Sequence, residues 1–508
     1  MQTLRRAVLG QTRQPPNYPI NPTDTVLPVY YFDDTPLLRN CVECWTLRFH
    51  DPLDAEMLRE SLSRVLVRPG WRKLGGRIRM SKKEKLEIHV PEAFTPERPA
   101  LGFHHDVFDV SIDEHPLAST LPQPTPGRLS LQAKRSEFAS LGVPAGTPLS
   151  IGDYIKSDHP QLTLHVVSFT DATLVSLCWP HIAVDAMSLR DLGVAWSLVL
   201  AGRESGIPPM LSAGEDPMAR AGYDLAFTKP HVLENQVIKG WRMWLFAIYY
   251  IFELLWWRTI ESRAVFLPRK NVQKLRDQAL ASLTSTSSPP PFISEGDVVA
   301  AWLTVMVSSA VFPKGTNRSF RVGNAYDLRG RAPSLFPDDK GAYVQNAVFP
   351  TWTSILARSM NSDDALGIVA LAIRNSIIQQ TTEAMIHAQA RLTREFLEYS
   401  GIPPMYGDAS AFTCHFTNWS KANFFEAVNF EPAIISKSSN RNDAKSSARN
   451  DEWEPAAPGH PVYYHIIGVS PNNMLSRNAS IISRTPGGDY WINGNYPPEV
   501  WKLIESTT

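Results

Sequence analysis

The stretch TLVSLCWPHIAVDAMSLRD, Thr173–Asp191, places His181 where an apolar run gives way to a segment with helical spacing. The run before His181 carries no charged residue and is typical of a strand buried on both faces. After it, one helical face is apolar and comprises Leu189, Leu192, Trp196 and Val199. The pattern predicts a buried strand, a short turn that carries His181 and Asp185, and a helix.

The His-x-x-x-Asp spacing occurs three times, at His50–Asp54, His105–Asp109 and His181–Asp185. Thirteen histidines predict about 0.6 chance matches at average amino-acid usage, so the spacing alone is weak evidence. We expect Asp54 to cap a helix and His105 to lie in a charge-rich loop. Only His181 combines a strand end with partial burial, which is typical of functional side chains. A structural histidine, with Asp185 as a helix cap, stays the alternative.

The flanking sequence predicts layers of strands and helices. Residues 161–179 alternate with a period of two around a Thr-Asp-Ala turn, which is typical of a β-hairpin. Residues 49–71 indicate a strand end, a turn and a helix, whose apolar face comprises Leu58, Leu62, Val65 and Leu66. Because strands and helices mix without regular alternation, we expect mixed-sheet α/β layers rather than a barrel or a doubly wound sheet.

A Pro/Gly-rich stretch, residues 201–222, interrupts the regular pattern and predicts a crossover between two halves. We expect an N-terminal domain at 1–215, a crossover segment with an apolar helix at 216–262, and a C-terminal domain at 263–508. The second half shows further patterns: a strand and helix at 262–280, a helix at 293–311, a strand-like run at 462–469 and a closing segment at 489–504. The Ser/Thr/Pro-rich residues 281–292 predict a loop, and the polar residues 434–461 a flexible excursion.

Composition excludes several classes of protein. The chain has 508 residues, 50 Lys and Arg, 50 Asp and Glu, and a net charge of +0, so nothing indicates a nucleic-acid partner. The four cysteines include one Cys-x-x-Cys pair without a second pair, so we expect reduced thiols and no metal site. The N-terminus lacks the apolar core of a signal peptide, and we expect a cytoplasmic protein.

Residues 241–257 form the only candidate for membrane contact. Arg242 and Glu253 bracket ten apolar residues, whereas spanning a bilayer takes roughly 20. The segment therefore predicts a buried or surface-lying amphipathic helix that does not span. Its tryptophans leave contact with a membrane or with an apolar substrate open.

Six segments in order resemble the BAHD acyltransferases, in particular their fungal branch that esterifies secondary-metabolite alcohols. HIAVDAMS resembles the family's His-x-x-x-Asp-Gly segment, NAYDLRGR its Asn/Asp-x-Arg-x-Arg strand, and YVQNAV its Tyr-x-Gly-Asn segment. The first helix with its Gly-Gly-Arg turn, ISEGDVVAAWL and FTNWSKANFFEAVNFEPA complete the likeness. The chain departs from the pattern at Ala186, where the family has glycine, and at Asn429, where it has aspartate.

The resemblance implies a two-domain fold like that of chloramphenicol acetyltransferase, with a channel between mixed sheets flanked by helices. It implies that the protein transfers an acyl group, with acetyl as the first expectation, from acyl-CoA to a hydroxyl of a terpenoid, polyketide or alkaloid, and that His181 is the general base. It places Thr417 and the indole N–H of Trp419 at the oxyanion, with core packing as the alternative for Trp419. The co-substrate is acyl-CoA; no tightly bound cofactor and no metal are implied, and the family is usually monomeric.

The resemblance also assigns structural residues. It implies that Asp185 turns away from the channel and pairs with Arg329, with Arg331 as the less favoured partner, and that Asn429 belongs to a structural segment. Two other functions stay open. A condensation-type domain would take acyl groups from a carrier protein, and a non-catalytic binding or membrane-surface protein could use the same fold.

Overall fold

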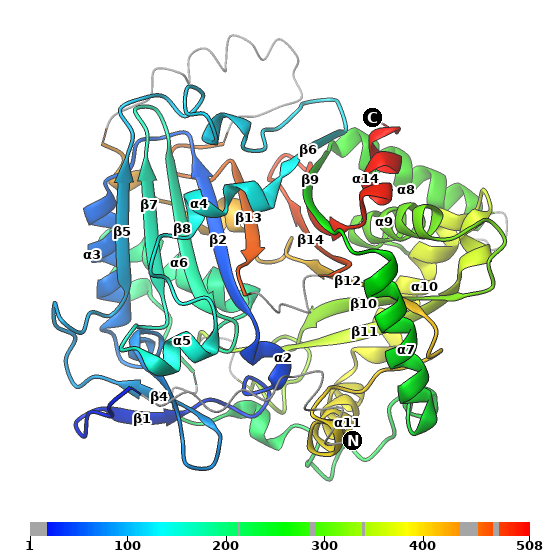
Figure 1. Cartoon of the computed structure of the whole chain (residues 1–508), viewed down its shortest axis with the longest axis horizontal. Coiled ribbons are helices and arrows are strands. Elements are labelled where there is room, and N and C mark those ends of the chain that lie inside the picture. The colour runs from blue at the N-terminus through cyan, green and yellow to red at the C-terminus, as the bar shows by residue number, and fades with distance from the viewer. Residues whose placement is uncertain are drawn as a thin grey trace.

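The computed structural model describes residues 18–211, 214–284, 291–337, 341–435, 456–470 and 477–507. Two large sheets lie side by side, one of five strands and one of seven (Figure 1). The smaller sheet has the order β13 (Tyr463–Gly468), β2 (Val42–Phe49), β8 (Thr173–Pro180), β7 (Thr163–Ser168) and β5 (Gly102–Val107). The larger has the order β11 (Val348–Leu356), β10 (Ser319–Asp327), β12 (Phe412–Asn418), β14 (Ala479–Arg484), β15 (Tyr490–Tyr496), β9 (Glu261–Leu267) and β6 (Ser130–Lys134).

The five-stranded sheet contains the predicted hairpin. β7 and β8 pair antiparallel around the turn at 169–172, and every residue of β8 is buried, as its apolar run predicted. Helix α6 (Ala186–Leu200) follows the turn, and Leu189, Leu192, Trp196 and Val199 are all buried. Helix α3 (Ala55–Leu66) packs beside α6, and Asp54 caps it by accepting a hydrogen bond from the N–H of Met57 at 3.0 Å. These predictions are confirmed.

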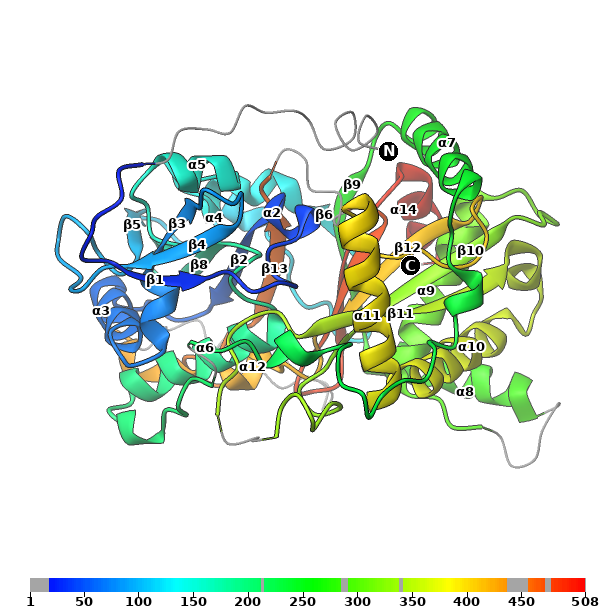
Figure 2. The same ribbon diagram turned by 90° about the horizontal axis from the view of Figure 1, so that it is seen from below.

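The seven-stranded sheet carries its own helical layer, formed by α8 (Arg269–Thr284), α9 (Glu295–Val311), α10 (Ala365–Gln380) and α14 (Pro498–Glu505). The predicted strand and helix at 262–280 and the helix at 293–311 are present as β9, α8 and α9. A capping box starts α9, because Ser294 and Asp297 each accept a hydrogen bond from the other's backbone N–H. Seen from below, the molecule has two lobes, the first built on the five-stranded sheet and the second on the seven-stranded sheet (Figure 2). Helix α11 (Glu383–Ser400) lies along the second lobe where it faces the first.

Each sheet takes one strand from the other half of the chain. β6 leaves the first half to pair with β9, and β13 returns from the second half to pair with β2. Buried Arg135, directly after β6, donates to the carbonyl oxygens of Ile466 (2.6 Å) and Gly494 (3.1 Å), one in each sheet. The expected segments 1–215 and 263–508 therefore do not correspond to one sheet each, because each sheet contains one strand from the other segment. The exchanged strands hold the two sheets together.

Smaller elements complete the chain. A three-stranded sheet has the order β1 (Thr25–Pro28), β4 (Leu86–Val90) and β3 (Arg77–Met80). The short helices are α2 (Pro36–Arg39), α4 (Ala139–Gly142), α5 (Ile151–Lys156) and α12 (Phe424–Ala427). Residues 241–256 form one helix, α7 (Trp241–Trp256). Among the described residues, no helix is long and apolar enough to cross a membrane.

The expectation for His105 was wrong, and two predicted segments lie partly outside the described residues. His105 is not in a loop: it lies on β5, which pairs parallel with β7 at the edge of the sheet. Because an edge strand tolerates exposed charges, its sequence lacks the apolar alternation that predicts a strand. Of the predicted loop at 281–292, residues 281–284 instead continue α8, and residues 285–290 lie outside the described residues. Most of the predicted flexible excursion at 434–461 also lies outside them. All four cysteines are buried thiols that take part in no disulfide.

Candidate active site

His181 opens the turn between β8 and α6, and its backbone is held on both sides. Its N–H donates to the carbonyl oxygen of Cys41 at 2.8 Å, and its own carbonyl oxygen accepts from Nδ2 of Asn346 at 2.8 Å. The side chain is partly exposed, while Nδ1 is buried and meets no hydrogen-bond partner among the described residues. The backbone therefore determines where the imidazole lies, and no carboxylate of the described chain orients it.

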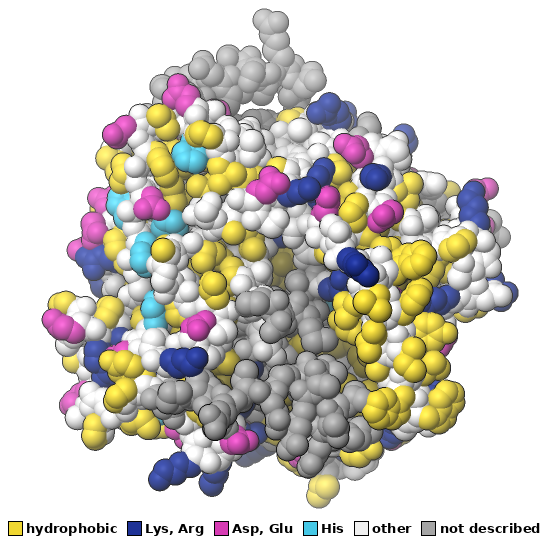
Figure 3. Space-filling model, in the orientation of Figure 1, with side chains coloured by type: hydrophobic (Ala, Val, Ile, Leu, Met, Phe, Trp, Pro, Cys, Tyr) yellow, Lys and Arg dark blue, Asp and Glu magenta, His cyan; other side chains and the backbone are white. Residues whose placement is uncertain are grey.

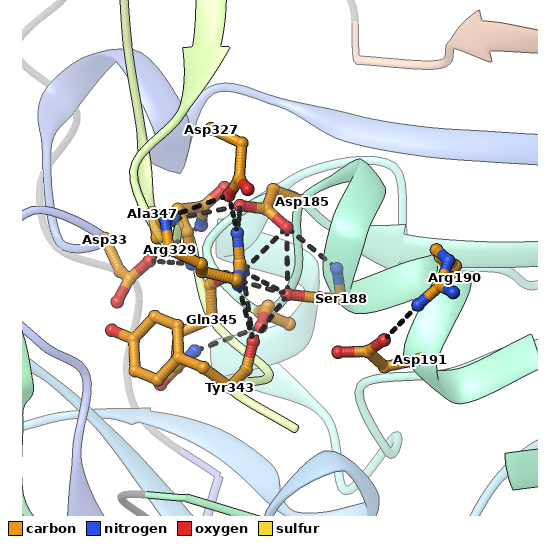
Figure 4. A network of polar contacts seen from close by, with 12 residues as sticks. Asp33, Asp185, Ser188, Arg190, Asp191, Asp327, Arg329, Tyr343, Gln345 and Ala347 are labelled. Atoms are coloured by element: carbon orange, nitrogen blue, oxygen red, sulfur yellow. Dashed lines mark hydrogen bonds and ion pairs between the residues drawn. The ribbon is translucent and has the colours of Figure 1, made fainter. Parts of the chain in front are cut away.

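Asp185 does two structural jobs at the end of the same turn (Figure 4). It caps α6, since Oδ1 accepts from the N–H and the hydroxyl of Ser188, both at 2.9 Å. It also forms a bidentate pair with Arg329, in which both nitrogen–oxygen distances are 3.0 Å. Oδ2 accepts a further bond from the N–H of Ala347 at 2.9 Å. Both carboxylate oxygens are thus occupied away from His181.

Arg329 is the centre of this buried network. Besides Asp185, it donates to Asp327 at 2.7 Å and to the carbonyl oxygens of Tyr343 (3.0 Å) and Gln345 (2.8 Å). Burial alone would lower the pKa of its guanidinium, but the carboxylates of Asp185 and Asp327 raise that pKa above its ordinary range. Burial alone would likewise raise the pKa of Asp185, yet Arg329 and the neighbouring N–H groups hold it below 3.8. The pair is therefore fully charged in the folded protein near neutral pH.

Arg331, the less favoured candidate, does not reach Asp185. It donates to the hydroxyl of Thr381 at 2.7 Å. The chain turns sharply after β10, so side chains two residues apart leave in different directions. The structure thus brings Arg329, rather than Arg331, to the turn that carries His181.

Three consecutive residues, 345–347, hold the turn from the opposite side, and sequence reasoning assigned none of them a role. Gln345 and Asn346 bind backbone carbonyl groups of the turn, and Ala347 binds its carboxylate. The bonds join Gln345 Nε2 to the oxygen of Ala183 (3.0 Å), Asn346 Nδ2 to that of His181 (2.8 Å), and Ala347 N to Oδ2 of Asp185 (2.9 Å). The YVQNAV motif was the available signal, but a motif alone does not say which atoms it binds.

Two buried charges support this segment and carried no signal in the sequence. Oδ1 of Asp33 accepts from the N–H of Asn346 at 3.1 Å and from its Nδ2 at 2.7 Å, and burial raises the pKa of Asp33 to about 7. Lys73 donates to the amide oxygen of Gln345 and lies 3.8 Å from the centre of the Tyr30 ring; burial lowers its pKa to about 8. Both groups act on the turn through residues 345 and 346.

We expect Asn346→Leu to lower kcat about tenfold and to reduce the free energy of unfolding by about 1–3 kcal/mol, because two buried acceptors lose the side-chain amide that donates to them. These acceptors are the carbonyl oxygen of His181 and the carboxylate of Asp33. Asn361→Leu is the control, since it removes one amide donor from the carbonyl oxygen of Ala357 in the second lobe. Steady-state kinetics and urea unfolding test both variants. Equal effects in the two would contradict a specific role for Asn346.

Thr417 and Trp419 lie at the end of β12, in the seven-stranded sheet. Thr417 is partly exposed and lies between Ala325 of β10 and Ile481 of β14. Trp419 is buried, with its ring centre 5.5 Å from that of Phe424 and 6.4 Å from that of Tyr464. Its indole N–H finds no hydrogen-bond partner among the described residues.

Within the described chain, no hydrogen bond joins Thr417 or Trp419 to His181. Tyr464, which packs on Trp419, pairs with Leu47 of β2, and Leu47 pairs with Val175 of β8. Val175 precedes His181 by six residues, roughly 20 Å along a strand. Trp419 therefore lies beside the middle of the five-stranded sheet, in its apolar core.

Asn429 contacts the second half of α6, far from the turn that carries His181. Its N–H donates to the hydroxyl of Ser197 at 2.9 Å, and its side-chain oxygen accepts from the N–H of Glu431 at 2.9 Å. Ser197 follows Asp185 by twelve residues, roughly 18 Å along a helix. Asn429 thus shapes a turn that packs against the second half of α6.

The two remaining candidates are His105 and a metal site. His105 pairs with the hydroxyl of Ser168 at 2.9 Å on the neighbouring strand. Among the described residues, no group of three His, Cys, Asp or Glu side chains could hold a metal ion.

Comparison with known proteins assigns the chain to a family. No family model matches the chain. The acetyltransferase pyiB of Pyricularia grisea is 36% identical over 494 residues, which cover 96% of this chain and 94% of the relative. The O-acetyltransferase PaAT-2 of Phomopsis amygdali is 36% identical over 497 residues, which cover 95% and 97%.

A solved structure shares the fold. The crystal structure of F. sporotrichioides TRI101 complexed with coenzyme A and T-2 matches with a TM-score of 0.63 at 15% identity, over 95% of this chain and 97% of that one. This likeness confirms the predicted chloramphenicol-acetyltransferase-like fold of mixed sheets flanked by helices. Together with the order of the motifs and the identity to the fungal relatives over nearly the whole chain, it shows that this protein belongs to the fungal branch of the BAHD acyltransferases.

Proposed function

We propose that the protein transfers an acetyl group from acetyl-CoA to a hydroxyl group of a secondary metabolite, with His181 as the general base. The observation that carries the proposal is the turn at His181: its backbone is fixed on both sides while Asp185 is engaged by Arg329. The acceptor is a hydroxylated terpenoid, polyketide or alkaloid. The names of the fungal relatives support acetyl as the acyl group, and the coenzyme A bound to TRI101 supports a thioester donor.

The reaction needs one group that first takes and then returns a proton. The neutral imidazole of His181 accepts the proton of the acceptor hydroxyl as its oxygen attacks the thioester carbonyl carbon. The carbon–oxygen bond forms, and the carbonyl oxygen becomes an oxyanion. When the oxyanion collapses, the carbon–sulfur bond breaks, and the imidazolium protonates the departing thiolate. Transfer is direct, without an acyl-enzyme, and it needs no metal.

The oxyanion requires a fixed donor, and we propose the hydroxyl of Thr417. The hydroxyl lies on a strand, which restricts its position better than a loop would. The indole N–H of Trp419 meets no hydrogen-bond partner among the described residues, but its packing on Phe424 and Tyr464 in the apolar core supports a structural role rather than a second donor.

We expect Thr417→Val to lower kcat by roughly 10²-fold with little change in KM, because an oxyanion donor binds the transition state more strongly than the substrate. Valine keeps the volume and removes only the hydroxyl. Thr417→Ser is the control, and it should recover most of the lost kcat. A rise in KM at constant kcat would instead make Thr417 a binding residue.

One assay separates the three functions that the sequence left open. The purified chain is incubated with acetyl-CoA and a panel of hydroxylated terpenes, polyketides and alkaloids, and release of free thiol is followed. Thiol release that depends on the acceptor supports the proposal. Activity only with an acyl group on a carrier protein indicates a condensation-type enzyme, and binding without turnover indicates a non-catalytic protein.

We propose further that the chain acts as a monomer in the cytoplasm. Light scattering of the purified protein and cell fractionation test the two parts separately.

A further inference from the structure

Helix α7 presents a broad apolar face to solvent. Trp241, Ile248 and Trp256 are 72%, 62% and 68% exposed. The face also includes Trp244, Ile251, Phe252, Leu254 and Leu255. Figure 3 shows the patch as a continuous hydrophobic area over α7 on the second lobe. A patch of this size on one helix marks an interaction surface.

The opposite face of α7 holds the helix firmly on the protein. Glu253 is buried and forms an ion pair with Arg318. Arg477 donates to the carbonyl oxygens of Glu253 (3.2 Å) and Trp257 (2.6 Å), and Arg242 donates to that of Gly407 (2.5 Å). These contacts fix both ends of the helix. The apolar face is therefore presented outward by a clamped helix, and it is not the result of loose packing.

Between α7 and the sheet lies a cavity of about 80 Å³. Phe246, Tyr249 and Tyr250 line it from the helix, and Thr413 and His415 line it from β12. The inner positions of α7 thus pack against the sheet, whereas the outer positions stay exposed, with Phe252 and Trp256 stacked on each other.

The chemistry of the outer face fits the interface of a lipid bilayer. Tryptophans stand at both ends of the apolar face, at 241 and 244 and again at 256, where indole rings prefer the headgroup region. Exposed Lys239 and Arg258 flank the helix, and its single acidic residue, Glu253, is buried. Sixteen residues span roughly 24 Å, which suits a helix lying in the plane of the membrane.

A second copy of the chain fits this face less well. In a two-fold, antiparallel contact, the Lys239 end of one helix would meet the Arg258 end of the other. The two cations would approach each other, and α7 offers no exposed acidic side chain to pair them, because Glu253 is engaged inside; Lys239 has only an exposed contact with Glu395 at 3.9 Å. A negatively charged lipid surface neutralises both ends at once.

We propose that α7 docks the protein peripherally on a bilayer that contains anionic lipids. The apolar side chains enter the boundary between headgroups and acyl chains, and Lys239 and Arg258 contact the headgroups. The helix does not cross the membrane. Docking does not depend on the acyl-transfer reaction, so the proposal stands or falls independently of the proposed function.

Flotation with vesicles tests the proposal on the full chain. Vesicles of phosphatidylcholine alone and of phosphatidylcholine with 30% phosphatidylserine are mixed with wild type and with the triple variant Trp244→Glu/Ile248→Glu/Leu255→Glu. The control triple variant, Leu225→Glu/Ile368→Glu/Ile378→Glu, replaces three exposed apolar residues elsewhere. Thermal unfolding confirms that both variants fold.

We expect wild type and control to float with the anionic vesicles and their tryptophan emission to shift to shorter wavelength. The partition coefficient of the α7 variant should fall by about 10- to 100-fold, because three side chains no longer enter the bilayer. Absence of wild-type binding to both vesicles, or equal loss in both variants, would overturn the proposal. Light scattering that shows a dimer broken only by the α7 variant would assign the face to a second copy and overturn it too.

Discussion

The variant His181→Ala is expected to lower kcat by roughly 10²-fold or more, the usual cost of losing general-base catalysis. The melting temperature should change little, because the imidazole is partly exposed and its backbone bonds to Cys41 and Asn346 do not require the side chain. Steady-state kinetics with acetyl-CoA and thermal unfolding measure the two effects separately.

His105→Ala is the matched control. It removes a histidine from the same His-x-x-x-Asp spacing, but this histidine lies on β5 and pairs with Ser168. Its activity should equal that of the wild type. Activity that survives in His181→Ala, or equal losses in the two variants, would show that His181 is not the base.

The second large effect concerns the pair of Asp185 and Arg329. Arg329→Met leaves the buried carboxylate of Asp185 without a cation and should reduce the free energy of unfolding by about 3–5 kcal/mol. Asp185→Asn should cost less, because Asp327 still pairs with Arg329 at 2.7 Å. Activity should fall as well, because the same contacts fix the turn that carries His181. Urea unfolding measures the loss of stability.

The double variant should lose less than the sum of the single losses, since the second change removes the charge that the first one orphans. Glu56→Gln and Arg59→Met provide a control cycle on α3, where an exposed pair at 2.6 Å should couple by no more than about 0.5 kcal/mol. Strictly additive losses for Asp185 and Arg329 would show that the pair contributes nothing beyond its separate contacts.

The pH dependence of the free energy of unfolding provides a second test of the Asp185–Arg329 pair. The folded pKa of Asp185 lies below its ordinary value of 3.8, despite burial, because of Arg329 and the N–H donors. A lowered pKa contributes stability above the unfolded pKa and loses it as the pH falls toward the folded one. The free energy of unfolding of the wild type should therefore fall below about pH 4 more steeply than that of Asp185→Asn.

The sequence alone predicted those features that depend on neighbouring residues. The alternation of residues 161–179 predicted the hairpin of β7 and β8, and the helical spacing after Asp185 predicted the buried face of α6. Asp54 was recognised as a helix cap for the same reason, because a cap acts on an N–H only three residues away. Ordered motifs then indicated the family and the fold, which no single pattern could do.

Other features were decided by contacts between residues far apart in the chain. Asp33 meets Asn346 across 313 positions, and Asn346 meets His181 across 165, so no local pattern could reveal that they support one turn. His105 looked like a loop residue because its strand lies at a sheet edge, where pairing with β7 rather than apolar alternation defines it.

The orientation of the apolar helix α7 likewise could not be predicted from local sequence. The composition of residues 241–256 predicted a helix but not which face would be covered. The ion pair of Glu253 with Arg318, from 65 positions away, turns one face inward and leaves the tryptophans outward. Local sequence therefore determined the helices and the buried strands, whereas tertiary packing decided the edge strand β5 and which side chains meet, because burial depends on what the rest of the chain places opposite.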